Sequence, residues 1–240
     1  MDASLIANEC IDFSLKSNKA GVLCKLDIEK AFNVSWDFLL TILKKMGFPD
    51  KWRKWISFCI STFKYSVLIN GEASGFFSSS KGLRQEYPFS PLLFILVMES
   101  LSKLINKACE MSLLKGFHAG NSHSPDFLVS HLLFANDTLI FCRPCESDLG
   151  YLRCNLLLFE AMSRLRVNLS KSSLIPIGEV PNIHLLACFF GCEVCTLPST
   201  YLGLPLEASF KSIAVGILLW RGFKKGLQGG NLKCCLKGEN

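Results

Sequence analysis

The sequence predicts an α+β fold with an antiparallel sheet packed against helices. Apolar residues recur every three or four positions, as in amphipathic helices, over four segments: 36–46, 50–60, 90–110 and 147–161. Short β-type runs, several of them joined by tight-turn signals, occupy 22–28, 65–69, 129–134 and 138–142. The resulting order is strand, two helices, hairpin, long helix, hairpin and helix, followed by short strands. This order favours an α+β domain over a series of βαβ units.

Composition limits the class of protein. The chain has 240 residues, of which 50% are hydrophobic and 19% charged, so it is not a disordered protein. Its longest apolar run, 91–98, is too short to cross a bilayer, and the residues before it contain no signal-peptide pattern. The 12 cysteines are scattered through apolar segments, which favours a reducing environment. We therefore expect an intracellular protein without a membrane partner, and the net charge of +6 is compatible with a polyanionic partner.

The first predicted strand, 22–28, alternates loosely and ends in a charged segment, so we expect it to deliver Asp27 to an edge or a cleft. Ser35 is expected to cap the helix over 36–46, and Asp50 to cap the helix that follows. The second of these helices is expected to bury one apolar stripe, made of Trp52, Trp55, Ile56, Cys59 and Ile60.

Turn signals organise the rest of the chain. Asn70-Gly71 predicts a type I′ hairpin, because both central residues of that turn need positive φ. Ser90-Pro91 predicts an N-cap followed by the first residue of a long, mostly apolar helix that ends near Glu110. The two apolar runs around Ala135-Asn136-Asp137 predict a hairpin with a polar tip. Short β-like segments are expected around Val167 and over 174–177, and no structure is predicted after Gly222.

Acidic residues at two distant places are the most informative chemical feature. Asp27 ends a predicted strand, and Asp137 lies at a predicted hairpin tip next to Asn136. If the two strands were neighbours, these oxygen ligands would suit Mg²⁺, and a pair of such ions can activate a hydroxyl and stabilise leaving pyrophosphate. Taken alone, the feature is more often ordinary turn chemistry.

Three segments together resemble motifs A, B and C of the reverse transcriptases of LINE-type, non-LTR retrotransposons of the kind abundant in plant genomes. They are Lys25-Leu-Asp-Ile-Glu-Lys-Ala-Phe-Asn33, Gly82-Leu-Arg-Gln-Glu-Tyr-Pro-Phe-Ser-Pro-Leu-Leu-Phe94 and Ser130-His-Leu-Leu-Phe-Ala-Asn-Asp-Thr-Leu-Ile-Phe141. Val167-Asn-Leu-Ser-Lys-Ser172 and Tyr201-Leu-Gly-Leu-Pro-Leu206 extend the resemblance. It implies a palm with part of the fingers over residues 1–210, no complete thumb, and a divergent, poorly ordered tail over 211–240.

The resemblance also implies a catalytic set. Asp27, Asn136 and Asp137 stand at the positions of the metal ligands in a two-magnesium site for RNA-directed DNA synthesis. Lys171 resembles the motif D lysine that donates a proton to pyrophosphate.

Substrate positions follow from the same resemblance. Phe32 matches the aromatic steric gate that excludes a ribose 2′-hydroxyl, and Arg84 and Gln85 match residues that line the incoming nucleotide and the template. The implied partners are an RNA template, a DNA primer and deoxynucleotides.

The departures from the family pattern predict weak or absent activity. Asn136 replaces the first aspartate of the motif C pair, which removes one negative charge from the predicted magnesium site. Glu86-Tyr87 replaces Gly-Asp in motif B, which adds bulk and changes the charge near a nucleotide. Two functions therefore stay open: a polymerase that is impaired, and an inert remnant that binds nucleic acid.

Other patterns have simpler explanations. Cys142-x-x-Cys145 and Cys192-x-x-Cys195 resemble a zinc site, but the 46 residues between the pairs are more than a zinc ribbon normally has, and incidental cysteines are the more common case. The four histidines have neither helical spacing nor a neighbouring acid, which is typical of ordinary surface or core residues.

Overall fold

The computed structural model describes residues 2–29, 32–84, 87–119 and 127–206, and a six-stranded sheet forms its centre. The strand order is β10-β9-β1-β7-β6, and β8 also pairs with β1. These strands are β1 (Gly21–Glu29), β6 (His131–Phe134), β7 (Asp137–Cys142), β8 (Arg166–Val167), β9 (Ser173–Ile177) and β10 (Glu193–Val194). All pairs are antiparallel except the edge pair of β9 with β10, which is parallel. The predicted α+β class is confirmed, and a wholly antiparallel sheet is wrong only at that edge.

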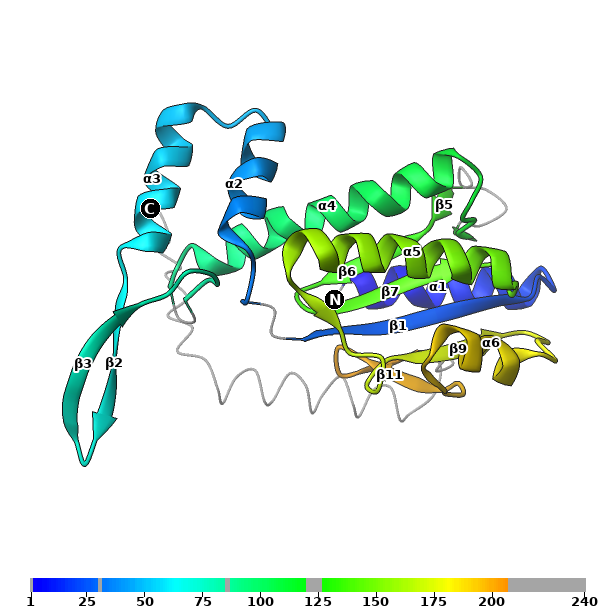
Figure 1. The fold of residues 1–240 in the computed structure, drawn as a ribbon. Coiled ribbons are helices and arrows are strands. Elements are labelled where there is room, and N and C mark those ends of the chain that lie inside the picture. The colour runs from blue at the N-terminus through cyan, green and yellow to red at the C-terminus, as the bar shows by residue number, and fades with distance from the viewer. Residues whose placement is uncertain (1, 30–31, 85–86, 120–126, 207–240) are drawn as a thin grey trace, which may run out of the picture.

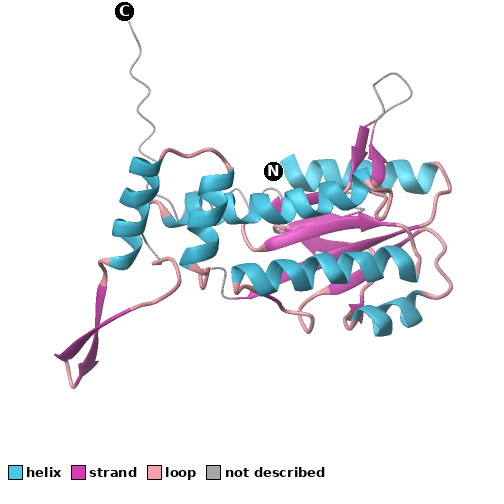
Figure 2. Ribbon diagram, turned by 45° about the horizontal axis from the view of Figure 1, so that its top comes forward, coloured by secondary structure: helices cyan, strands magenta, loops and turns pink. Residues whose placement is uncertain are grey.

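Both faces of the sheet are covered (Figures 1 and 2). Val22, Cys24 and Leu26 of β1 pack into the core beneath α4 (Ser90–Glu110), α5 (Glu146–Ser163) and α6 (Ile183–Phe190). Leu23 belongs to the second core, on the opposite face, with α1 (Asp2–Lys16), β4 (Phe117–Ala119), β5 (Phe127–Val129), β11 (Ser199–Tyr201) and β12 (Leu204–Leu206). Burial on both faces explains why the middle of β1 is almost continuously apolar.

The two helices α2 (Trp36–Lys45) and α3 (Asp50–Ser61) and the hairpin of β2 (Lys64–Ile69) and β3 (Glu72–Ser78) lie at one end of the molecule (Figure 1). Ser35 caps α2 as predicted, because its Oγ accepts the N–H of Phe38 at 3.4 Å. The predicted hairpin turn is also confirmed, with φ of +51° at Asn70 and +88° at Gly71.

Three details predicted for the helices are wrong. Asp50 and Ser90 are the first residues of α3 and α4, and the caps are Pro49 and Phe89, which make no side-chain cap hydrogen bond. Asp50 pairs instead with Arg53 in the first turn of its own helix. Trp55 is 57% exposed, because the buried side of α3 is the narrower stripe of Ile56 and Ile60.

The sequence did not predict α1, α6 or the short strands β4, β5, β10, β11 and β12. The stripe that α1 buries includes the small residues Ala7 and Cys10, which give a weak hydropathy signal. Pairs of two or three residues are too short to show a period. The predicted tail over 211–240 lies outside the described residues, and none of the described helices is long and apolar enough to cross a membrane.

Candidate nucleotidyl-transfer site

The sheet places the two acidic residues side by side. Asp27 on β1 is the direct cross-strand partner of Asp137 on β7. The hairpin between β6 and β7 has Ala135 in the left-handed region at φ +50°, and this tight turn sets Asn136 immediately before Asp137. Since side chains alternate along a strand, Lys25 and Asp27 share the face of Leu23, which is the face that α1 covers farther along β1.

Asn136 is held to β1 by two hydrogen bonds. Its Nδ2 donates to Oδ1 of Asp27 at 2.9 Å, and its carbonyl oxygen accepts the N–H of Ile28 at 3.1 Å. An ionised carboxylate only accepts, so the amide must present its N–H side to Asp27. Asn136 therefore acts as a hydrogen-bond donor to Asp27, a role that an ionised aspartate could not take.

The charges around Asp137 oppose one another. Partial burial raises the pKa of the Asp137 carboxyl, the ammonium group of Lys25 lowers it, and the charge of Asp27 raises it further. Lys25 is oriented by a hydrogen bond from Nζ to the carbonyl oxygen of Thr200 at 2.7 Å.

Tyr201 lies beneath this end of the sheet. It is 1% exposed, and burial together with the charge of Asp137 raises its pKa to about 12. Among the residues that the structure describes, its hydroxyl has no hydrogen-bond partner. A neutral phenol therefore forms part of the protein interior near the carboxylate of Asp137.

A turn that follows β8 fixes the backbone of Asp27. The N–H of Asn168 donates to the carbonyl oxygen of Asp27 at 2.8 Å, and the N–H of Asp27 donates to Oγ of Ser172 at 3.3 Å. Asn168 also donates from Nδ2 to Oε1 of Glu29 at 3.0 Å. Lys171 is an exposed residue of this turn, and its backbone N–H donates to the carbonyl oxygen of Asn168 at 3.1 Å. Asn168 and Ser172 were not singled out, although both lie in a segment that carries the family resemblance.

Phe32 follows β1 and is half-buried, with its ring centroid 6.2 Å from that of Phe94 on α4. The loop after it is bonded to the segment before α4: the N–H of Gly82 donates to the carbonyl oxygen of Val34 at 2.8 Å, and Nε1 of Trp36 donates to the carbonyl oxygen of Gly82 at 2.7 Å. Gly82 has φ +90°, and a Cβ there would lie 3.1 Å from the carbonyl oxygen of Phe32. The predicted motif A and motif B segments are thus in contact.

Arg84 contacts the base of the β2–β3 hairpin. It is exposed, and its guanidinium lies 5.2 Å from the ring centroid of Phe63, at the base of the β2–β3 hairpin. The ring of Tyr87 lies edge-on to the same phenylalanine at 5.3 Å. Gln85 and Glu86 lie outside the described residues.

The oxygen ligands that the described residues offer determine how many metal ions could fit here. Among residues 2–29, 32–84, 87–119 and 127–206, no group of three His, Cys, Asp or Glu side chains could hold a metal ion. Asp27 and Asp137 fit one Mg²⁺, which is commonly held by one or two carboxylates, waters and substrate phosphates. The two-ion set predicted from Asp27, Asn136 and Asp137 fits poorly, because Asn136 contributes no negative charge and turns its amide N–H toward Asp27.

The comparisons with known proteins agree with this arrangement. Residues 3–206 match the family model described as reverse transcriptase (RNA-dependent DNA polymerase). The chain is 46% identical over 76 residues to an uncharacterized mitochondrial protein of Arabidopsis thaliana, covering 32% of this chain and 60% of that protein. It is 24% identical over 238 residues to the transposon TX1 uncharacterized 149 kDa protein of Xenopus laevis, covering 94% of this chain and 18% of that protein. It is 28% identical over 116 residues to the retrovirus-related Pol polyprotein from type-1 retrotransposable element R2 of Popillia japonica, covering 48% of this chain and 18% of that protein.

A solved structure has a similar fold. Apo telomerase from Candida tropicalis, truncated from its C-terminal domain, superposes with a TM-score of 0.57 at 16% identity, covering 84% of this chain and 38% of that one. The chain spans 60% or less of each curated relative named above. The motif-based prediction of the family is confirmed by the match over residues 3–206, and the chain belongs to the reverse transcriptase family.

Proposed function

We propose that this chain is the palm region of an RNA-directed DNA polymerase from a LINE-type retrotransposon, and that Asn136 impairs its nucleotidyl transfer. The observation that carries the proposal is the cross-strand pair of Asp27 and Asp137, with the amide of Asn136 donating to Asp27 at 2.9 Å. The substrates would be an RNA template, a DNA primer and deoxynucleotides.

Each residue has a role in this proposal. Asp27 and Asp137 would hold Mg²⁺, which reverse transcriptases generally use and which supplies charge stabilisation to the transferring phosphoryl group. The turn that contains Asn168 and Ser172 holds the backbone of Asp27 in place. Lys171, on that turn, is the proposed proton donor to pyrophosphate.

Phe32 is the proposed steric gate, because its ring packs near that of Phe94 and it lies three residues after the end of β1, the strand of Asp27. Arg84, at the base of the hairpin, and Gln85 are the proposed nucleotide and template contacts.

The impairment follows from the side chain at position 136. An aspartate there would add a third carboxylate, whereas asparagine adds no charge and donates a hydrogen bond to one of the ligands. That hydrogen bond uses one lone pair of Oδ1 of Asp27 and so competes with a cation for this oxygen.

Primer extension on an RNA template tests the proposal. With Mg²⁺ and with Mn²⁺, we expect little or no extension by the natural chain and extension by Asn136→Asp. Adding Asp27→Ala to that variant should abolish it. Asn106→Asp, which adds the same charge at an exposed position of α4, is the matched control and should show no extension. Efficient primer extension by the natural chain would contradict the proposed impairment. Absence of extension by Asn136→Asp would show that Asn136 is not what prevents activity.

A second candidate, an inert remnant that binds nucleic acid, is favoured by the same hydrogen bond of Asn136. It predicts salt-dependent binding of an RNA–DNA hybrid by the natural chain, and no nucleotide incorporation by Asn136→Asp.

A further inference from the structure

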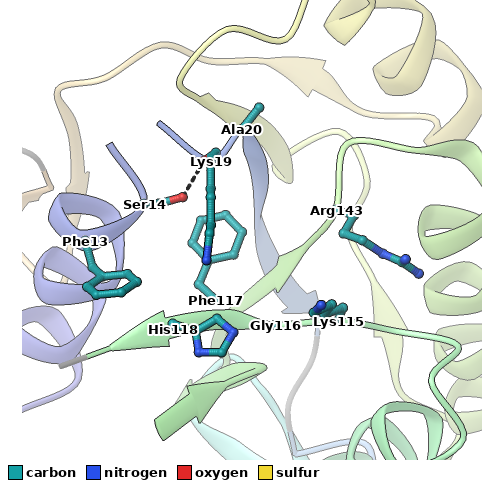
Figure 3. Close-up of a pocket in the computed structure, with 9 residues that line it drawn as sticks. All are labelled: Phe13, Ser14, Lys19, Ala20, Lys115, Gly116, Phe117, His118 and Arg143. Carbon is teal, nitrogen blue, oxygen red and sulfur yellow. Dashed lines mark hydrogen bonds between the residues drawn. The ribbon is translucent and has the colours of Figure 1, made fainter. Parts of the chain in front are cut away.

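A cavity lies at the opposite end of the strand pair that carries Asp27 and Asp137. Gly21 begins β1, six residues before Asp27, which corresponds to about 20 Å along a strand. The cavity, here called the rear pocket, has a volume of about 320 Å³ and is lined by Phe13, Lys19, Lys115, Phe117, His118 and Arg143, among others (Figure 3). Three segments that are distant in sequence build it: the end of α1 with the turn after it, the start of β4 with the residues before it, and the residue after β7.

The charge of the rear pocket is positive. Lys19 and Lys115 have no carboxylate partner among the described residues, and none of the described residues that line the cavity is acidic. Arg143 also lines it, but its guanidinium is turned away from Lys19 and pairs with Asp148, with Nη2 to Oδ1 at 2.7 Å (Figure 3). Two ammonium groups are therefore available to an anionic ligand.

A buried carboxylate holds one wall of the rear pocket in place. Asp148 is 0% exposed and accepts from Nε and Nη2 of Arg143 and from the backbone N–H of Lys115, the latter at 3.3 Å. Because the charge of Asp148 is compensated by Arg143, it does not neutralise Lys115. The position of Lys115 is thus fixed by its backbone, while its side chain stays available.

Aromatic side chains form the other part of the rear pocket. Phe117 lies against the start of β1, where a Cβ on Gly21 would be 2.1 Å from its ring, so only glycine leaves room for it. Phe117 also packs on Phe141, with ring centroids 5.1 Å apart. Phe13 and His118 form a tilted pair at 6.3 Å on the neighbouring side. Rings beside unpaired lysines are the combination with which proteins bind single-stranded nucleic acid, because bases stack on rings and phosphates pair with cations.

We propose that the rear pocket binds a nucleoside phosphate within a single-stranded nucleic acid, with the phosphate at Lys19 and Lys115 and the base against Phe13. The volume of about 320 Å³ lies at the lower end of the range of small-ligand sites, which suits one nucleotide. The site rests on the cavity itself and does not depend on polymerase activity.

The test measures binding of a fluorescent ten-nucleotide uridine strand to the full chain by anisotropy, over a series of salt concentrations. For a single strand, replacing two phosphate-binding lysines should make the negative slope of log binding constant against log salt concentration shallower by about 1.4. Near 0.15 M salt this corresponds to about a tenfold loss of affinity. We expect this loss in Lys19→Gln/Lys115→Gln. The control Lys44→Gln/Lys45→Gln removes the same charge from exposed residues of α2 and should change affinity by less than about twofold.

Cross-linking locates the contact independently. A strand that contains 4-thiouridine should cross-link to the peptide with Phe13, and Lys19→Gln/Lys115→Gln should abolish this product. Uridine monophosphate serves as competitor: if millimolar amounts do not displace the strand, the polymer is the ligand, as proposed. Displacement by the monophosphate would assign the pocket to free nucleotides and overturn the single-strand assignment. Equal losses in both lysine pairs, or cross-links only elsewhere, would overturn the site. All these readouts are independent of primer extension, so failure of the polymerase proposal would be seen separately.

Discussion

Asn136→Asp should make folding of this chain depend on magnesium. The substitution replaces the hydrogen bond from Asn136 to Asp27, which is 2.9 Å long, by two facing carboxylates. Loss of a hydrogen bond to a charged group costs about 1.5–3 kcal/mol. Repulsion between two unit charges 4 Å apart adds up to about 4 kcal/mol at an effective dielectric constant of 20, and less when the side chains turn to solvent. Without metal, we expect the variant to lose about 3 kcal/mol of unfolding free energy.

Thermal unfolding of the full chain, with and without Mg²⁺, measures this effect. For a domain of this size, 1 kcal/mol corresponds to about 2–4 °C, so the expected decrease in Tm without metal is about 6–12 °C. Mg²⁺ at 100 times its Kd would restore about 2.7 kcal/mol to the variant. The control Asn106→Asp should show neither effect, because Asn106 is exposed on α4. A variant as stable as the natural chain in the absence of metal would refute the role given to the hydrogen bond. A Tm that does not respond to Mg²⁺ would refute the role of position 136 as a ligand.

Three further predictions concern the same end of the molecule and the rear pocket. Because the pKa of Asp137 is raised in the folded state, its ionisation lowers the free energy of unfolding above the folded pKa and has no effect below the unfolded value of about 3.9. Asp137→Asn should therefore raise Tm at pH 7 and lose this advantage near pH 3. A difference in Tm that stays constant with pH would contradict the raised pKa. Gly21→Ala should lower the free energy of unfolding, measured with urea, by about 1–3 kcal/mol, because its Cβ would meet the ring of Phe117. The control Gly150→Ala should not lower it, because a Cβ there has no neighbour closer than 3.7 Å. Equal effects of the two substitutions would refute the steric argument. Tyr201→Phe removes a buried hydroxyl that has no hydrogen-bond partner among the described residues. Calorimetry should therefore find the free energy of unfolding unchanged or higher by up to about 1 kcal/mol. A clear decrease in that free energy would show that the hydroxyl is hydrogen-bonded.

Much of the fold followed from short-range patterns. The stripes of α2, α4 and α5 and the Asn70-Gly71 turn are local signals, and the structure contains all of them. The stripe of α3 was wrong at Trp55 because periodicity gives the direction of a side chain and not what covers it. The short strands after α6 were missed because their pairing partners supply the ordering that two or three residues lack.

The candidate site shows the same division. The sequence alone identified Asp27, Asn136 and Asp137, since each stands at the end of a recognisable element, and three ordered motifs identified the family. Only the tertiary structure decided that Asp27 faces Asp137, that Asn136 donates to Asp27, and that Lys19 and Lys115 meet at the rear pocket. These relations join residues about 100 positions apart, and they depend on strand register and packing. A local pattern determines which way a side chain points, whereas the residue that it contacts is determined by how the strands pair and pack in the folded protein.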